Sequence, residues 1–178
     1  GPTRQADLYD GEVFDAQLEP RDWNRVGFDD SDWYMAMPHK RAMSPDTLLK
    51  PYPAEPVRAT EELKPVAYWR VARGKVIYDF GQNFAGHVRL HVKGKAGGVV
   101  RMRFGEMVNQ DKSLYIDNMR SAVCTDTYVM KGLKREVWEP KFTFHGFRYV
   151  EVTGCPVPPS LDNVTGVVGG SDTRRVGH

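Results

Sequence analysis

Apolar and polar residues alternate along two neighbouring stretches in the middle of the chain. The alternation runs from Val88 to Val92 and again from Val100 to Phe104, with basic side chains between the apolar ones. A period of two places one face of a strand against a core and the other face in solvent. Because only a short Gly-rich segment separates the two runs, we expect them to pair as an antiparallel hairpin.

Further short runs with strand character occur before and after these two, and glycines, prolines and polar residues separate them. The predicted strands are Lys75 to Phe80, Thr125 to Met130, Val137 to Phe144, Phe147 to Val152 and Val164 to Val168. Connections this short leave no room for helices that cross between parallel strands. The pattern therefore predicts an all-β fold, an antiparallel β-sandwich or jelly roll.

The two ends of the chain lack this regular alternation. Prolines at positions 20, 38, 45, 51, 53, 56 and 65 prevent long regular elements, so residues 1–65 are expected to form an extended, Pro-rich strap that packs on a sandwich of residues 66–170. Within the strap, Asp29 to Asp32 are expected to start a helical turn that seats Trp33 in an apolar site. The polar segment 171–178 is interpreted as a linker toward another domain.

Composition narrows the classes of protein to consider. Of the 178 residues 40% are hydrophobic, which suffices for one core of ordinary size. The 25 basic and 23 acidic residues are interspersed, so we expect no nucleic-acid partner, and no stretch is apolar enough for a membrane span. Cys124 and Cys155 are too few for a disulfide framework, and two unpaired thiols are favoured over one bridge. No secretory signal is visible, so the localisation stays open.

One loop group combines an aromatic face with planar polar groups, as sugar-binding sites do. It comprises Tyr115, Asp117, Asn118 and Arg120, and Trp138 is a candidate for an additional stacking surface. In the competing interpretation Tyr115 and Trp138 pack in the core, since large aromatic residues are usually buried, and Arg120 pairs with a carboxylate. These five residues are the predicted carbohydrate-binding candidates.

No catalytic or metal-binding residue is assigned. Glycoside hydrolysis by inversion needs two carboxyl groups about 6.5 to 9.5 Å apart. Glu106, Asp111 and Asp117 form the best acidic cluster, but their context indicates turn capping rather than acid catalysis. Residues 109–120 begin like a calcium loop, yet Leu114 replaces the required glycine and Arg120 the required glutamate. We expect no cofactor, and an irregular calcium site remains an open alternative.

The segment from Asp79 to Gly86 contains two glycines and several short polar side chains. Gly81 and Gly86 permit unusual backbone angles, and Asp79 can accept hydrogen bonds from backbone amides, so the segment is expected to form a corner of the sheet. A sugar contact here is an alternative, because loops often carry binding sites. Gly146 is expected to turn the chain between two strands.

Several ordered blocks of sequence resemble bacterial α-L-rhamnosidases of glycoside hydrolase family 78. The blocks are Leu8 to Ala16, Phe28 to Trp33, Asp79 to Gly86, Leu114 to Ala122, Thr125 to Tyr128 and Phe142 to Val152. The resemblance implies a concanavalin-like β-sandwich domain. In that family this domain follows a sugar-binding-like module and precedes an (α/α)6 barrel that holds the catalytic site.

The resemblance implies a non-catalytic accessory domain whose parent enzyme hydrolyses terminal α-L-rhamnose with inversion. Its expected partner is the catalytic (α/α)6 domain of the same parent chain. A free-standing carbohydrate-binding module for rhamnose-containing glycans is the alternative. A third hypothesis is an independent hydrolase or lyase that uses Glu106 and Asp117.

Overall fold

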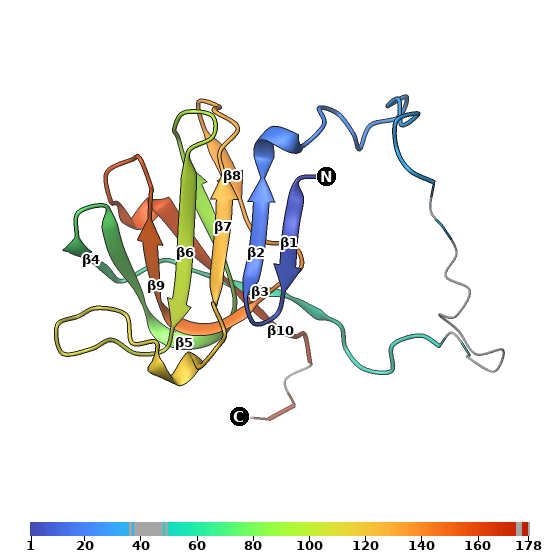
Figure 1. Ribbon diagram of the computed structural model, residues 1–178. Helices are drawn as coiled ribbons and strands as arrows, with labels where there is room; N and C mark the ends of the chain where they lie inside the picture. The colour runs from blue at the N-terminus through green and yellow to red at the C-terminus, as the bar shows by residue number, and fades with distance from the viewer. Residues whose placement is uncertain (36, 38–47, 49, 174–175, 178) are drawn as a thin grey trace.

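The computed structural model describes residues 1–35, 37, 48, 50–173 and 176–177, and within them the fold is all-β (Figure 1). The strands are β1 (Thr3–Asp7), β2 (Gly11–Asp15), β3 (Val57–Leu63), β4 (Ala67–Ala72), β5 (Lys75–Val92), β6 (Val99–Gly105), β7 (Thr125–Val129), β8 (Glu136–Trp138), β9 (His145–Thr153) and β10 (Val164–Ser171). The short 3-10 helices are η1 (Ala16–Leu18), η2 (Asp117–Met119) and η3 (Leu161–Asn163). The all-β prediction is confirmed. In this part of the chain no helix is long and apolar enough to cross a membrane.

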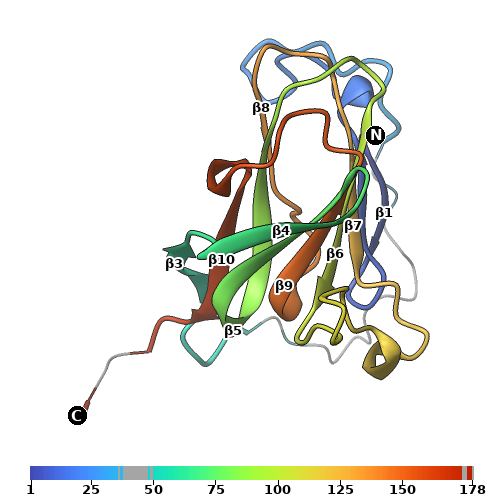
Figure 2. The same cartoon turned by 90° about the vertical axis from the view of Figure 1, so that its left-hand side faces the viewer.

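The strands form one curled sheet whose two halves face each other (Figures 1 and 2). The strand order is β1-β2-β7-β6-β9-β5-β10-β3, with β4 and β8 also paired to β5. The neighbours are antiparallel except β2 and β7, which run parallel. The long strand β5 belongs to both halves: its first part pairs with β4 and β9, and its last part pairs with β10 and β8.

The strand β5 bends between Asp79 and Phe84, where its register against β9 shifts. Gly81 has φ +78° there, and its amide donates to Asp79 Oδ1 over 2.7 Å. The left-handed region is open to glycine without the steric cost that other residues incur. The corner predicted at this segment is confirmed, and the bend lets one strand serve two layers.

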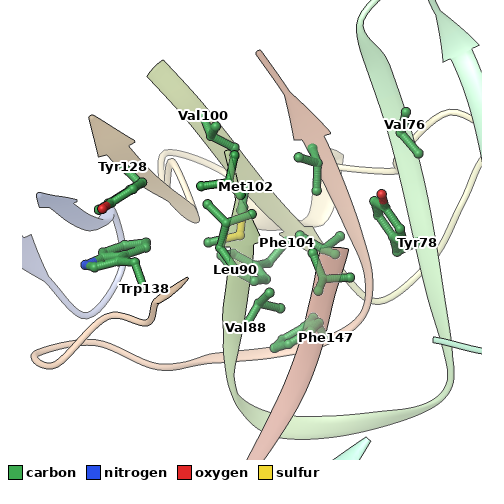
Figure 3. Close-up of a cluster of buried hydrophobic side chains, with 14 of the residues drawn as sticks. Val76, Tyr78, Val88, Leu90, Val100, Met102, Phe104, Tyr128, Trp138 and Phe147 are labelled. Carbon is green, nitrogen blue, oxygen red and sulfur yellow. The ribbon is translucent and has the colours of Figure 1, made fainter. Parts of the chain in front are cut away.

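The predicted hairpin between residues 88–92 and 100–104 is wrong, although both runs are strands with the predicted faces. β6 pairs with β7 and β9, whereas residues 88–92 of β5 pair with β8 and β10. The intervening residues carry the chain from one layer to the other. In Figure 3 Val88 and Leu90 lie opposite Met102 and Phe104 across the core. The alternation reflects two facing layers, because both buried faces contribute to the same core.

Phe147 lies at the centre of an aromatic cluster in this core and is fully buried. Its ring centroid is 4.4 Å from that of Phe84, 4.8 Å from Phe104 and 5.8 Å from Phe80. The neighbouring Gly146 belongs to β9, so the predicted turn at Gly146 is wrong. Strand β9 begins at His145 and continues through both residues.

The segment expected to be a strap contributes three strands to the sheet. β2 pairs with β7, and β3 pairs with β10. Residues 30–33 form the expected turn, and the Trp33 ring lies 5.5 Å from that of Phe28 between centroids. Trp33 is 51% exposed, so its predicted apolar seat is wrong. Residues 36, 38–47 and 49 of the strap, and 174–175 and 178 of the linker, lie outside the described residues.

Candidate functional site

Three connections at the end of the sandwich that is drawn lowest in Figure 1 carry exposed apolar side chains. They come from the β1–β2 turn, the β6–β7 loop and the β8–β9 loop, and their exposed fractions run from 50% for Val123 to 74% for Tyr9. We call this group the apolar end: Leu8, Tyr9, Val123, Phe142 and Phe144. Scattered exposed apolar residues need no explanation, but a grouped set marks an interaction surface.

Hydrogen bonds fasten the three connections of the apolar end to one another. The Cys124 amide donates to the Tyr9 carbonyl over 3.0 Å, and the Val123 amide donates to Asp10 Oδ1 over 3.1 Å. The Thr143 hydroxyl donates to the Asp7 carbonyl over 3.0 Å. The exposed side chains therefore stand on a backbone that is held in place across long sequence separations.

Two fully buried carboxylates lie beneath the apolar end. Glu12 Oε2 accepts hydrogen bonds from the amides of Lys141 and Phe142, at 2.8 and 2.9 Å. Asp126 Oδ1 accepts from the Glu12 amide over 3.0 Å and lies 3.1 Å from His145 Nε2. One acid thus holds the β8–β9 loop and the other holds the start of β2.

The second oxygen of each acid, Glu12 Oε1 and Asp126 Oδ2, is buried without a hydrogen-bond partner among the described residues. Buried polar atoms without partners reduce stability. Since hydrophobic residues at these two positions would avoid that loss, we attribute the carboxylates to positioning: their satisfied oxygens fix the loops that carry Phe142 and Leu8.

The structure brings four of the five predicted sugar-binding residues together and separates the fifth. Tyr115, Asp117, Asn118 and Arg120 lie on the β6–β7 loop, where Asp117 and Asn118 belong to η2. Asp117, Asn118 and Arg120 are exposed, and Tyr115 is half-buried. The loop leaves the sandwich at the same end as the apolar end (Figure 1).

Trp138 lies in the core with 7% of its surface exposed. Its ring centroid is 5.1 Å from that of Tyr128, which lies beside it in Figure 3, and 6.0 Å from that of Phe14. The stacking surface predicted for Trp138 is therefore corrected: burial among aromatic rings leaves no open face for a sugar. The competing interpretation, core packing, describes this residue.

The acidic candidates Glu106 and Asp111 stabilise loop structure. Glu106 Oε1 accepts from Asn83 Nδ2 over 2.9 Å. Asp111 Oδ1 accepts from the hydroxyl and the amide of Ser113, and these bonds hold the pKa of Asp111 below its usual value. A general acid in glycoside hydrolysis needs a raised pKa instead. Among the residues that the structure describes, no group of three or more His, Cys, Asp or Glu side chains is arranged to hold a metal ion.

The carboxylate of Asp79 is paired rather than open to a ligand. Arg148 donates from Nε to Oδ1 over 2.8 Å and from Nη2 to Oδ2 over 2.9 Å. The Arg148 bonds, together with the Gly81 amide, hold the pKa of Asp79 below its usual value of 3.8. This pair joins the corner of β5 to β9, in keeping with the structural interpretation of the segment.

Replacing Arg148 with methionine is expected to flatten the loss of stability in acid. The folded-state pKa of Asp79 lies below its unfolded value, so the pair stabilises the fold above pH 3.8, and that contribution disappears as the pH falls through the folded-state pKa. Without Arg148, proton uptake on unfolding near pH 3 should decrease by a fraction of a proton. Urea unfolding between pH 2.5 and 6 measures this slope, and Asp79→Asn should reduce it likewise. An unchanged slope in Arg148→Met would contradict the assignment.

A second candidate surface is a shallow groove of about 450 Å³ on the outer face of the sheet formed by β1, β2, β7, β6 and β9. Its lining is Gln5, Asp10, Gly11, Val13, Arg101, Arg103, Val123, Thr125, Thr127, Glu151 and Thr153. None of the predicted sugar-binding residues belongs to it. The sequence indicated this surface only through Arg101 and Arg103, the polar positions of the alternating strand β6. They identified a face of the sheet that is open to solvent, but not the shape of that face.

The chain matches two family models. The bacterial alpha-L-rhamnosidase concanavalin-like domain matches residues 69–169, and the alpha-L-rhamnosidase N-terminal domain matches residues 1–61. An alpha-L-rhamnosidase of Streptomyces avermitilis is 45% identical over 168 residues, which cover 94% of this chain and 16% of the relative. One from Alteromonas sp. is 39% identical over 154 residues, covering 86% of this chain and 16% of the relative.

Solved structures show the same similarity in three dimensions. The Streptomyces avermitilis alpha-L-rhamnosidase complexed with L-rhamnose superposes with a TM-score of 0.92 at 44% identity, covering 97% of this chain and 16% of that one. The alpha-L-rhamnosidase of Dictyoglumus thermophilum superposes with a TM-score of 0.88 at 37% identity, covering 97% and 19%. The chain thus spans less than a fifth of the length of these relatives.

Proposed function

The chain belongs to the bacterial alpha-L-rhamnosidase concanavalin-like domain family, and on this basis we propose that it is a non-catalytic accessory domain of a glycoside hydrolase of the α-L-rhamnosidase kind. Its role is to support the hydrolysis of terminal α-L-rhamnose by the parent enzyme. The partner is the catalytic (α/α)6 domain of the same parent chain, and the segment 171–178 is the connection to it.

The observation that carries this proposal is the apolar end on its rigid base. Grouped apolar side chains with half or more of their surface exposed stabilise a complex when a partner covers them. The hydrogen bonds beneath them, above all those of Glu12 to the amides of Lys141 and Phe142, fix the surface before a partner arrives. Such preorganisation lowers the entropy lost on association.

The end of strand β10 lies on the same side of the sandwich as the apolar end. Strand β10 ends at Ser171, at the end of the sandwich that is drawn lowest in Figure 1 and carries the apolar end.

The docking role is tested in the parent enzyme by the double substitution Phe142→Ser and Phe144→Ser. Losing both aromatic anchors should release the domain and lower kcat/KM toward an aryl α-L-rhamnoside by about tenfold, because small displacements near an active site have large effects on rate. The thermal inactivation temperature should fall as well. The isolated chain should show no hydrolysis, and its unfolding should change little, since both side chains are exposed.

The matched control is Leu133→Ser, which removes an equally exposed apolar side chain from the turn before β8, at the other end of the sandwich. Parent enzyme with this substitution should keep its activity. If the double variant and the control behave alike, the apolar end is not the contact surface. Hydrolysis by the isolated chain at the level of the parent would contradict the accessory role itself.

A second candidate function is that of a carbohydrate-binding module for rhamnose-containing glycans, and the outer-sheet groove favours it. Its lining includes two arginines and two acidic residues, Arg101, Arg103, Asp10 and Glu151, so the groove is balanced in charge and rich in donors and acceptors for hydroxyl groups. Titration calorimetry with L-rhamnose, with and without calcium, tests it. Saturable heat that Arg103→Met abolishes would support this function, and no heat at millimolar sugar would exclude it.

A further inference from the structure

A basic pocket lies at the end of the sandwich opposite the apolar end. It is a depression of about 470 Å³ where the last residues of β5, the turn before β8 and the helix η3 meet. Its lining residues are Lys64, His91, Val92, Lys93, Arg135, Val157, Asp162 and Asn163. Neither the apolar end nor the groove on the outer face of the sheet shares a residue with this pocket.

Positive charge dominates this basic pocket. Lys64, Lys93 and Arg135 contribute cations, and Asp162 is the one carboxylate in the lining. Asp162 Oδ1 lies 3.6 Å from Lys64 Nζ. Among the residues that the structure describes, no carboxylate lies within 4 Å of Lys93 or Arg135. Two cationic side chains therefore face the pocket without a protein anion to balance them.

His91 indicates where the positive potential converges. Its ring is half-buried, and Nε2 lies 3.5 Å from the Thr165 hydroxyl. Burial lowers the pKa of His91 first, and the charges of Lys64, Arg135 and Arg89 lower it further, while Asp162 acts weakly in the opposite direction. The imidazole is neutral at pH 7, and it lies in a field that favours a bound anion.

The pocket lining also includes the side-chain amide of Asn163, and two hydrogen bonds to its oxygen fix its orientation. Asn163 Oδ1 accepts from the Ser160 amide over 2.8 Å and from the Tyr78 hydroxyl over 3.1 Å. With the oxygen engaged twice, the Nδ2 group is the free donor, and it bonds to none of the described residues. The pocket thus offers a fixed neutral donor beside its cations.

We propose that the basic pocket binds the carboxylate or sulfate group of an acidic sugar. Unbalanced Lys93 and Arg135 select an oxyanion, because charge-assisted hydrogen bonds to Arg and Lys are the strong ones. A volume of about 470 Å³ exceeds what a bare oxyanion fills and admits a monosaccharide ring, whose hydroxyl groups the Asn163 amide can bind. The choice of a sugar rests on the proposed role in a glycoside hydrolase, whereas the choice of an anion does not.

The test is a titration of the isotopically labelled chain at low ionic strength, followed by NMR, with sodium glucuronate, sodium sulfate and neutral glucose as probes. Saturable shifts of His91, Asn163 and Arg135 are expected with glucuronate and sulfate, and none with glucose. A bound anion stabilises the imidazolium, so the titration midpoint of His91 should rise with saturating glucuronate, and affinity should increase as the pH falls through that midpoint.

Arg135→Gln should weaken glucuronate binding by about tenfold or more, as expected for the loss of one charged hydrogen-bonding partner. Arg58→Gln is the matched control, since Arg58 is an exposed arginine near the start of β3, far from the basic pocket. Linear shifts that never saturate, equal binding in the two variants, or equal shifts with glucose would each overturn the proposal. Binding of sulfate without glucuronate would overturn the sugar as the ligand. None of these outcomes bears on the docking role, which is read from the activity of the parent.

Discussion

Phe147→Ala is expected to lower the free energy of unfolding by about 3 to 5 kcal/mol, the range for removing a buried phenylalanine from a core. Phe147 is fully buried, and its ring contacts those of Phe84, Phe104 and Phe80. These neighbours are held in two separate strands, Phe80 and Phe84 in β5 and Phe104 in β6, so they cannot all move to fill the cavity. Urea unfolding followed by tryptophan fluorescence measures the loss.

The same substitution at Phe142 provides the control, because Phe142 is 64% exposed. Phe142→Ala should change the free energy of unfolding by no more than about 0.5 kcal/mol. Phe142 and Phe147 lie only five residues apart in sequence, yet Phe147 belongs to the core and Phe142 to the surface. Equal losses for the two variants would show that the aromatic cluster around Phe147 does not hold the layers together.

Gly11→Ala is expected to lower the free energy of unfolding by about 3 kcal/mol or more, a loss that needs a specific structural cause. Gly11 has φ +105°, and a Cβ atom there would lie 2.4 Å from the Thr125 carbonyl oxygen and 2.8 Å from Asp126 Oδ1. Both contacts are too short to persist, so β2 must move away from β7. The hydrogen bond from the Glu12 amide to Asp126 would be lost with that shift.

Gly27→Ala separates backbone strain from this collision. Gly27 also has a positive φ, +84°, but nothing lies within 4 Å of its added Cβ atom. It should therefore show only the strain of a left-handed residue, about 1 to 2 kcal/mol. Equal losses at Gly11 and Gly27 would mean that the close approach of β2 to β7 is unimportant. Chemical shifts of Leu8 and Tyr9 should change in Gly11→Ala alone.

The strands after residue 75 were largely predictable from the sequence, but β1 to β4 and the pairing of the strands were not. Alternation at residues 88–92 and 100–104 reports which side chains are buried, and the structure agrees at each apolar position. An alternation of apolar and polar residues shows which face of a strand is buried. It does not show whether two such strands pair edge to edge or face each other across a core. The short connection between residues 92 and 99 suggested that the two runs pair with each other. Because β5 bends at Gly81, however, its last part lies in the layer opposite β6.

The candidate surfaces were less predictable, because exposure of an aromatic residue depends on contacts that are distant in sequence. Trp138 and Phe142 are close neighbours in the chain, and only the fold determines that the first is buried and the second exposed. The basic pocket draws on Lys64, His91, Arg135 and Asp162, from four separate segments. Such a set forms no local motif, whereas Asp79 and Gly81, only two residues apart, allowed the corner to be predicted.

The parallel pairing of β2 with β7 also has a consequence for how the chain folds on the ribosome. Glu12 and Asp126 are joined by a hydrogen bond across 114 residues. At the usual rate of about 5 to 20 residues per second, β2 waits roughly 6 to 23 s after its synthesis before β7 emerges. During that interval the β1–β2 pair has an open edge at β2, and the acidic side chain of Glu12 on that strand favours hydration. The Glu12 carboxylate, which keeps one oxygen unpaired in the finished fold, is therefore expected to oppose association of nascent chains through this edge.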